Sequence, residues 1–383
     1  MINQTDTELT GLRKYFKEQN IEFSVQRILI DGLGGMAFGL FASLLIGCII
    51  GTISNYVNIP VVINGETVNL LGQVRTYAYA VQGSAMACAI AYAMKAPPFI
   101  VYSCLTVGYA SNVMGEGGGP LAVFFVTLIA VFLGKLVSKR TPADIIVTPA
   151  VTIIGGVVAA ILIAPPIGQL AVMLGRVIMM ATELQPFLMG IVCSALMGVI
   201  LTLPISSAAV CSAFGLVGLA GGACVAGCCA HMVGFAVASY RENKMAGLLS
   251  QGIGTSMLQM PNLLRKPKLW LPPVAASIVN GPLATCGFKL LMNGAPISSG
   301  LGTSGLVGPI GVITGWMNPS EQAVAAVNGG LGVDLTAAYA NPALQWTGLV
   351  VVCLVVPAAV SLLVSELMRK KGVIEFGDYQ LDL

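Results

Sequence analysis

The stretch GLLSQGIGTSMLQMPNLLRKPKLWLPPVAASIVNG, residues 247–281, decides the fold of this chain. It interrupts an apolar sequence with polar side chains, glycines and a proline, then passes through a basic cluster into another apolar run. In hydrocarbon, irregular polar backbone is tolerated only where it is buried in protein or lines a cavity. We therefore expect a re-entrant hairpin at a solute site. Its polar residues are Gln251, Thr255, Ser256, Gln259 and Asn262.

The overall composition is that of an integral membrane protein. Of the 383 residues, 56% are hydrophobic and only 9% are charged, whereas soluble domains carry about 25% charged residues. The mean hydropathy is +0.87. The formal net charge of +3 gives no indication of a nucleic-acid partner. The expected partners are the lipid bilayer and a small polar solute.

Positive charges predict the orientation of the chain in the membrane. Lys and Arg cluster before the first apolar run, in a turn near residue 139 and after the last run, and such clusters favour the cytoplasmic side. Residues 54–74 contain neither type and are expected outside. Both termini would then be cytoplasmic, which requires an even number of crossings. The clusters are Arg13, Lys14, Lys17 and Arg27; Lys135, Lys139 and Arg140; and Arg369, Lys370 and Lys371.

We expect one membrane domain with short flanking segments. Residues 1–26 lack a small-residue cleavage site after a short apolar core, so they are interpreted as a retained cytoplasmic amphipathic helix. Residues 27–371 would form the transmembrane domain, and residues 372–383 a cytoplasmic C-terminal tail.

Nine apolar runs span, or nearly span, the roughly 30 Å hydrocarbon layer. The run 206–240 is too long for one helix and is interrupted by glycines, so we divide it into a short hairpin arm and a full span. The sequence thus predicts an all-α polytopic fold of about ten transmembrane helices. Residues 167–185 are expected to form a connecting helix, and the glycine-rich residues 293–316 a second re-entrant element. The runs are 28–53, 76–95, 97–113, 120–137, 145–166, 186–203, 206–240, 270–292 and 344–368.

All ten cysteines lie within apolar stretches. They are expected to behave as small hydrophobic residues in a reducing setting, so the sequence indicates no disulfide framework.

Two motifs are similar to those of the phosphotransferase system EIIC-like family, which includes PfoR-like regulators and sugar permeases. They are QGIGTSMLQMPNLLRKPKLWLPPVAASIVNGPLATCGFK, residues 251–289, and SSGLGTSGLVGPIG, residues 298–311. The resemblance extends over residues 22–369. It implies an EIIC-like bundle with re-entrant hairpins, usually a homodimer, in the bacterial cytoplasmic membrane. Transport domains of this group move like an elevator against a dimeric scaffold.

The hairpin departs from the sugar-transporting members in one position that matters. Their hairpin carries a glutamate in a Gly-x-x-Glu-Pro setting, whereas this chain has Gly254-Thr255-Ser256 and no acid. The sequence also contains no segment that could serve as an EIIA or EIIB domain. We therefore expect no enzyme activity, catalytic residue or cofactor in this chain alone; at most it is the membrane component that needs separate EIIA and EIIB proteins.

The amides and hydroxyls of the first hairpin suit a neutral sugar or polyol, because they both donate and accept hydrogen bonds. Leaving them unpaired in a dry site costs about 1–3 kcal/mol each. The alternative is a helix break whose polar groups satisfy one another.

Glu116 lies in the motif NVMGEGGGP between two apolar runs. Intramembrane carboxylates are costly and are functional candidates, and the following glycines would let the backbone approach a ligand. The alternative is an extracellular turn with a solvated acid.

His231 is the only histidine, and it shares one helix face with Cys224 and Cys228. One helix face rarely directs three side chains at one ion, so no metal site is expected. His231 either hydrogen-bonds in the bundle interior, or contacts the solute or senses protonation.

The remaining candidates are weaker. Thr303 and Ser304 could form a backbone-amide nest, and Asn280 could face the cavity or cap a helix end. Asp334 is expected at an external or interfacial helix. The basic residues around Arg265 indicate a cytoplasmic loop, with a docking surface for an EIIB-like partner as the alternative.

Two functions remain open at this point. The first is an EIIC-like transporter that binds and translocates a small polar solute, and the second is a membrane-embedded regulator or sensor that binds its ligand without transport.

Overall fold

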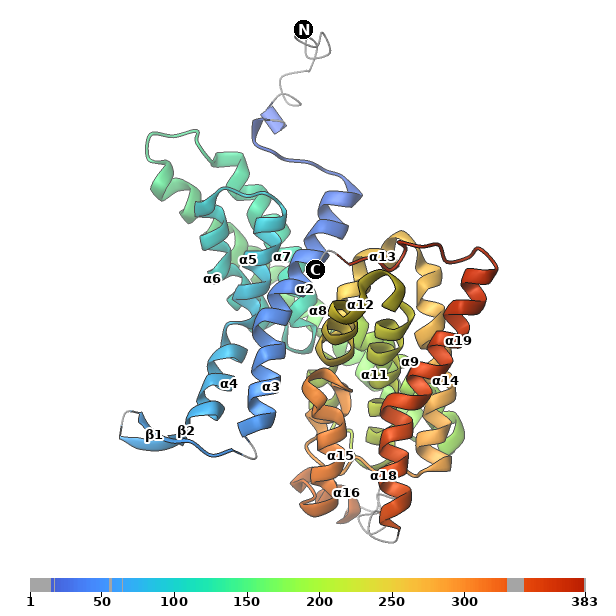
Figure 1. Ribbon diagram of the computed structural model, residues 1–383. Coiled ribbons are helices and arrows are strands. Elements are labelled where there is room, and N and C mark those ends of the chain that lie inside the picture. Colours follow the sequence, from blue (N-terminus) through green and yellow to red (C-terminus); the bar gives the residue numbers. More distant parts are fainter. Residues whose placement is uncertain (1–14, 17, 55–56, 64, 329–340, 382–383) are drawn as a thin grey trace.

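The computed structural model describes residues 15–16, 18–54, 57–63, 65–328 and 341–381, and these are almost entirely helical (Figure 1). Within these ranges the only sheet is an antiparallel pair of short strands, β1 (Pro60–Ile63) and β2 (Glu66–Asn69). The expected all-α membrane fold is confirmed. The predicted N-terminal amphipathic helix falls mostly on residues 1–14 and 17, and Asp334 falls on 329–340; both lie outside the described residues.

The N-terminal half begins with the first span, which runs from Gln26 to Ser54 and packs mainly against the helices Leu70–Ala80 and Gln82–Ala93. Small residues let this span touch its neighbours: a Cβ on Gly35 or Gly39 would lie 2.7 or 2.5 Å from carbonyl oxygens of α5. The elements are η1 (Gln26–Asp31), α2 (Gly32–Leu40), η2 (Phe41–Leu45), α3 (Ile46–Ser54), α4 (Leu70–Ala80), α5 (Gln82–Ala93), α6 (Pro98–Met114), η3 (Glu116–Gly118), α7 (Gly119–Val137) and α8 (Asp144–Thr182).

The C-terminal half surrounds α11 (Gly218–Ala238), whose most apolar window is 89% buried. Glycines allow the helices of this half to pack closely. A Cβ on Gly227 of α11 would lie 1.9 Å from the Ser194 carbonyl oxygen of α9, and a Cβ on Gly281 would lie 2.0 Å from the Gly190 carbonyl oxygen. The other helices here are α9 (Pro186–Thr202), α10 (Ser207–Ala213), α14 (Leu271–Pro282), η7 (Leu283–Gly287), α16 (Glu321–Asn328), α18 (Pro342–Val350), η10 (Val351–Val355) and α19 (Val356–Lys370).

The first hairpin is re-entrant, as predicted. The chain reverses at Thr255, whose backbone is extended at φ −153°. Asn243 before the reversal and Asn262 after it both bond to the C-terminal residues, so the two arms begin and end at the same side. The hairpin consists of α12 (Tyr240–Leu249), η4 (Ser250–Gly254), η5 (Ser256–Gln259) and α13 (Met260–Arg265).

The second predicted hairpin is also present, and it enters from the opposite end (Figure 1). It consists of η8 (Pro296–Gly300), η9 (Ser304–Leu306) and α15 (Val307–Met317). The Ser320 backbone N–H donates to the Asn293 carbonyl at 2.9 Å, which joins its two ends. The arms meet through glycines, since a Cβ on Gly294 would lie 2.3 Å from the Gly311 carbonyl oxygen.

Five helical segments of the described chain are long and apolar enough to cross a membrane. The predicted division of residues 206–240 is confirmed by α10 and α11, while the count of ten crossings stays a prediction. The separate connecting helix over 167–185 is wrong, because α8 continues through Pro165 and Pro166 to Thr182. Helix-breaking prolines are tolerated in membrane helices when neighbouring groups satisfy the freed backbone. The five segments are Gln26–Ser54, Glu116–Val137, Asp144–Thr182, Gly218–Ala238 and Pro342–Lys370.

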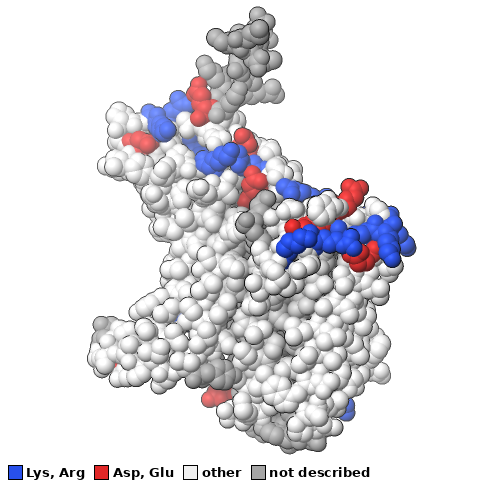
Figure 2. Space-filling view, viewed as in Figure 1, with Lys and Arg blue, Asp and Glu red and all other residues white. Residues whose placement is uncertain are grey.

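Charged side chains gather at one end of the molecule, the upper end in Figure 2. We call this end the charged face; it carries the ion pairs Arg27–Glu22, Arg27–Asp31, Arg140–Glu18, Arg241–Glu366, Lys266–Asp378 and Arg369–Glu242. The ten cysteines are free thiols, of which only Cys286 is exposed.

Candidate functional site

The tips of both hairpins meet the first span at a cavity of about 140 Å³, which we call the tip cavity. Three of the predicted site residues line it: Glu116, Thr255 and Ser304. Apolar walls come from the first span, including Leu40, Phe41 and Leu45. The other polar residues of its lining are Gln82, Asn112, Ser206 and Ser207.

Glu116 is brought to the cavity by a tight turn between α6 and α7. Its own φ of +44° lies in the left-handed region, which is uncommon for a residue other than glycine. Gly118 must stay small, because a Cβ there would lie 2.6 Å from the Ile167 carbonyl oxygen of α8. The turn thus fixes an exposed carboxylate against the tip cavity. It also borders an adjoining cavity of about 330 Å³.

The polar side chains of the tip cavity fall into two classes. Thr255 and Ser206 cap short helices, accepting from the backbone N–H groups of Met257 and Ala209 at 3.2 Å each, and Ser207 donates to the Gly300 carbonyl oxygen. The other class makes no side-chain hydrogen bond or ion pair with any residue in the described ranges, so its groups are available to a ligand. It comprises Gln82, Asn112, Glu116 and Ser304.

The amides of the first hairpin lie elsewhere and bond to one another. The Gln251 amide donates to the Ser239 hydroxyl at 2.8 Å and accepts from Gln259 at 3.0 Å. Asn262 donates to the Gln259 side-chain oxygen at 2.9 Å. Gln259 and Asn262 also donate to backbone carbonyls of the C-terminal segment. The structure therefore does not bring these three predicted residues to the tip cavity.

His231 and Ser256 belong to a buried cluster centred on Thr202. The Thr202 hydroxyl lies 2.9 Å from His231 Nδ1 and 2.8 Å from the Ser256 hydroxyl. His231 also packs against the rings of Phe235 and Trp270. Of the two sequence interpretations of His231, this geometry matches the histidine hydrogen-bonded in the bundle interior.

Asn280 and Thr303 are buried at helix contacts. The Asn280 amide of α14 donates to the carbonyls of Ala226 at 2.9 Å and Val352 at 2.8 Å, which ties three elements together. Thr303 donates to the Met232 sulfur at 3.6 Å. Neither lines the tip cavity.

Sequence reasoning missed Gln82 and Asn112 as cavity residues. Both carried a usable signal, since each is an amide within a long apolar segment and Asn112 stands in the same motif as Glu116. It also missed Thr202, which no local pattern distinguishes from a helix-surface threonine.

In the described ranges no group of three His, Cys, Asp or Glu side chains is placed to hold a metal ion. The chemistry that the tip cavity offers is hydrogen bonding from amides and hydroxyls, together with one carboxylate.

Comparison with known proteins gave one finding. No curated protein and no solved structure matches the chain. The family model described as "Phosphotransferase system, EIIC" matches residues 30–381, which include the tip cavity and both hairpins. The chain therefore belongs to the phosphotransferase system EIIC family.

Proposed function

We propose that this membrane component of a phosphotransferase system binds and translocates a small neutral sugar or polyol at the tip cavity. Membership in the EIIC family makes the chain a multi-pass permease component that works with an EIIB protein. The choice of solute rests on a group of unpaired side chains that line this one cavity: Gln82, Asn112, Glu116 and Ser304.

Their chemistry favours a neutral, hydroxyl-rich solute. A carboxylate accepts hydrogen bonds from two or more hydroxyls, while amides donate and accept. Among the described residues that line the tip cavity none is Lys or Arg, so an anionic solute would meet Glu116 without a counter-charge. Hydrogen bonds to a charged group contribute about 1.5–3 kcal/mol each, which makes Glu116 the strongest determinant of affinity.

Glu116 could also replace the acid that is missing from the first hairpin at Gly254-Thr255-Ser256. The first hairpin has no acid, yet its Thr255 lies at the same cavity as the Glu116 carboxylate from the α6–α7 turn. We infer that a different element supplies the acidic group that sugar-transporting relatives carry on the hairpin.

The charged face is proposed to lie in the cytoplasm. The first hairpin enters from this face and the second from the other end (Figures 1 and 2), and the positive-inside rule favours cytoplasmic placement of basic clusters. An EIIB partner would then dock near Arg241, Arg265 and Lys268. EIIB would supply the phosphoryl group.

A homodimer is proposed from the family. Among the five long helices α8 is the least covered, with 28% of its most apolar window buried. Its exposed apolar residues include Ile154, Leu162 and Met173, and these would contact a second copy or lipid. Cross-linking of a cysteine at position 162 in membranes tests this contact.

Uptake by sealed proteoliposomes tests the function. A panel of radiolabelled hexoses, pentoses and hexitols is offered with and without purified EIIA, EIIB and phosphoenolpyruvate. We expect saturable uptake of one class, with phosphorylated product only when the soluble partners are present. Ligand-dependent thermal stabilisation without flux in either condition would instead establish the regulator.

A further inference from the structure

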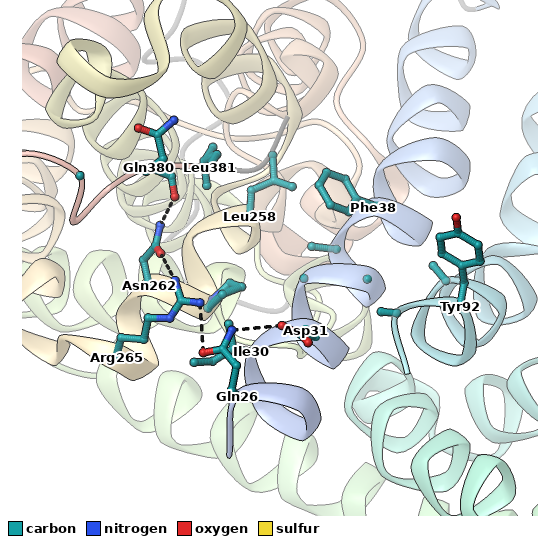
Figure 3. A pocket seen from close by; sticks show the side chains of 17 residues that line it. Gln26, Ile30, Asp31, Phe38, Tyr92, Leu258, Asn262, Arg265, Gln380 and Leu381 are labelled. Atoms are coloured by element: carbon teal, nitrogen blue, oxygen red, sulfur yellow. Dashed lines mark hydrogen bonds between the residues drawn. The ribbon is translucent and has the colours of Figure 1, made fainter. Parts of the chain in front are cut away.

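A second cavity of about 580 Å³ lies on the charged face, and we call it the vestibule (Figure 3). One wall is formed by η1 and α2 and includes Gln26, Asp31 and Phe38. The opposite wall is formed by the first hairpin, with Leu258 and Asn262. The vestibule therefore opens between the two halves of the chain.

The vestibule and the tip cavity lie in series along one seam. Phe38 of α2 lines the vestibule, and Leu40 and Leu45, farther along the same span, line the tip cavity. On the hairpin, Leu258 faces the vestibule while its neighbour Met257 faces the tip cavity, and both are buried, at 6% and 2% exposure. These two side chains separate the cavities, so displacing this part of the hairpin would join them.

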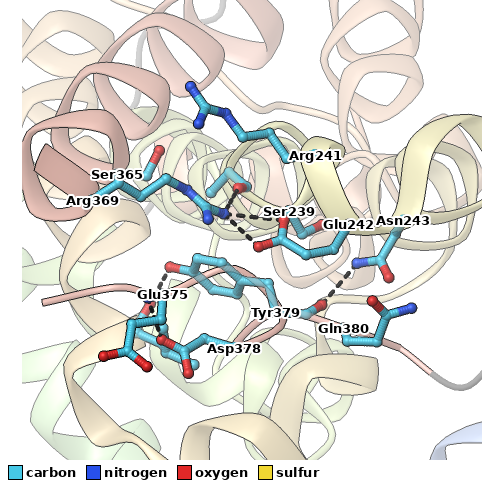
Figure 4. A network of polar contacts seen from close by, with 12 residues as sticks. Ser239, Arg241, Glu242, Asn243, Ser365, Arg369, Glu375, Asp378, Tyr379 and Gln380 are labelled. Atoms are coloured by element: carbon cyan, nitrogen blue, oxygen red, sulfur yellow. Dashed lines mark hydrogen bonds and ion pairs between the residues drawn. The ribbon is translucent and has the colours of Figure 1, made fainter. Parts of the chain in front are cut away.

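The C-terminal segment, residues 372–381, lies across the outside of the hairpin, and we call it the strap. It leaves α19 and turns at Gly372 and Gly377, whose φ angles of +67° and +99° suit glycine. Its side chains Ile374 and Tyr379 are 2% and 0% exposed. At its start, Arg369 of α19 forms a buried ion pair with Glu242 of α12 at 2.8 Å (Figure 4).

The strap binds the hairpin mainly through its own backbone. The Tyr379 carbonyl accepts from Asn243 at 2.8 Å and from Gln259 at 3.1 Å. The Gln380 carbonyl accepts from Asn262 at 2.8 Å. The Leu381 N–H donates to Asn243 Oδ1 at 2.8 Å. Three hairpin amides thus hold three consecutive residues of the strap.

These bonds continue across the vestibule to the first span (Figure 3). Asn262 Oδ1 accepts from Arg265 at 3.4 Å, and Arg265 donates to the Gln26 side-chain oxygen at 3.3 Å. The Gln26 amide in turn donates to Asp31 at 3.1 Å. A chain of hydrogen bonds therefore joins the Gln380 carbonyl to the first span and closes the seam at the charged face.

We propose that the strap is a latch on the first hairpin, and that the tip cavity opens to the charged face only after the strap has left Asn243, Gln259 and Asn262. This inference rests on the proposed function for its role in transport, but the latch itself is a conformational property. Solute released from the tip cavity would pass Met257 and Leu258 into the vestibule.

Cysteine accessibility tests the latch without any solute. A reporter cysteine replaces Ala208, which lines the tip cavity, in a background where exposed Cys286 and half-buried Cys88 are serine. Proteoliposomes that present the strap outward are captured through a C-terminal affinity tag. The measured quantity is the rate at which a membrane-impermeant methanethiosulfonate modifies the reporter.

Asn243→Ala removes two hydrogen bonds, both made to the strap, and should raise the modification rate about thirtyfold, the factor expected for two neutral hydrogen bonds. Gln380→Ala is the matched control and should leave the rate unchanged, because the strap uses the carbonyl and not the side chain of this residue. A folded Asn243→Ala protein with the parental rate overturns the proposal.

A second variant locks the strap instead of releasing it. Asn262→Cys and Gln380→Cys are added to the reporter protein, and a short bis-maleimide links the two introduced thiols through thioethers. Excess reagent is quenched before the methanethiosulfonate is added to the reporter at 208. The unlinked comparison is the same protein with each introduced thiol capped by a monofunctional maleimide. We expect the linked protein to show the slower modification rate; equal rates in linked and unlinked protein contradict the latch. If the modification rate of the reporter responds as expected but the protein shows no solute flux, the latch is supported and the proposed transport function is contradicted.

Discussion

The first hairpin and the tip cavity both place polar side chains in a largely apolar protein, but the two regions differ in the partners that these side chains have. Gln251, Gln259 and Asn262 bond to one another and to the strap, whereas Glu116 and Asn112 make no such bonds within the described chain. A paired polar group gains little from a ligand, while an unpaired one gains a hydrogen bond. Partners, more than composition, therefore distinguish a structural break from a binding site.

The largest effect is expected for Glu116→Gln. It removes the only carboxylate of the tip cavity among the described residues, and with it one or two charge-assisted hydrogen bonds to the solute. At about 1.5–3 kcal/mol for each bond, affinity should fall about a hundredfold. The measurement is solute affinity by isothermal titration, using the solute identified by uptake.

Glu183→Gln is the matched control, because Glu183 is an exposed acid at the end of α8 that lines neither the tip cavity nor the vestibule. Both variants should unfold at the parental temperature. Equal affinity of Glu116→Gln and parent would remove the tip cavity as the solute site.

Gln259→Ala should have the opposite pattern, with stability lost and affinity kept. Gln259 bonds to Gln251, Asn262 and the Tyr379 carbonyl, and each buried group left unpaired costs about 1–3 kcal/mol. We expect a loss of about 2–3 kcal/mol in the free energy of unfolding. Denaturant titration in detergent measures this free energy. If Gln259→Ala keeps the parental stability but no longer binds solute, the solute site lies at the first hairpin and not at the tip cavity.

Much of the fold could be predicted from sequence because hydrocarbon restricts the backbone so strongly. The break at 251–262, the glycine-rich second hairpin and the split at residues 206–240 all follow from that restriction. The end of α8 was missed because Pro165 and Pro166 indicate a helix boundary only when neighbouring helices do not support the chain. The bond from Gln259 to the Tyr379 carbonyl could not be predicted, since the two residues lie 120 positions apart.

Gln82→Ala should have a smaller effect than Glu116→Gln. Its amide lines the tip cavity from the start of α5 and would form neutral hydrogen bonds with the solute, worth about 1 kcal/mol each. Affinity should fall about fivefold, with no change in stability. Gln73→Ala in α4, outside the cavity, is the control. If both variants bind solute as the parent does, the solute does not contact this wall.

The smallest effect concerns the strap, through Tyr379→Phe. The buried hydroxyl donates to the Leu269 carbonyl at 3.0 Å, so its loss should cost about 1 kcal/mol of unfolding free energy at pH 8. Burial raises the pKa of the Tyr379 phenol above its usual value, which is about 10. Above that pH the unfolded chain releases the proton while the folded chain keeps it, so this contribution to stability falls as pH rises. The difference between parent and variant should therefore shrink above about pH 10. Denaturant titrations at pH 8 and above about pH 10 measure this difference in unfolding free energy. Tyr240→Phe, at an exposed tyrosine, is the control. A difference between parent and Tyr379→Phe that stays constant with pH would place the phenol in water and the strap away from the hairpin.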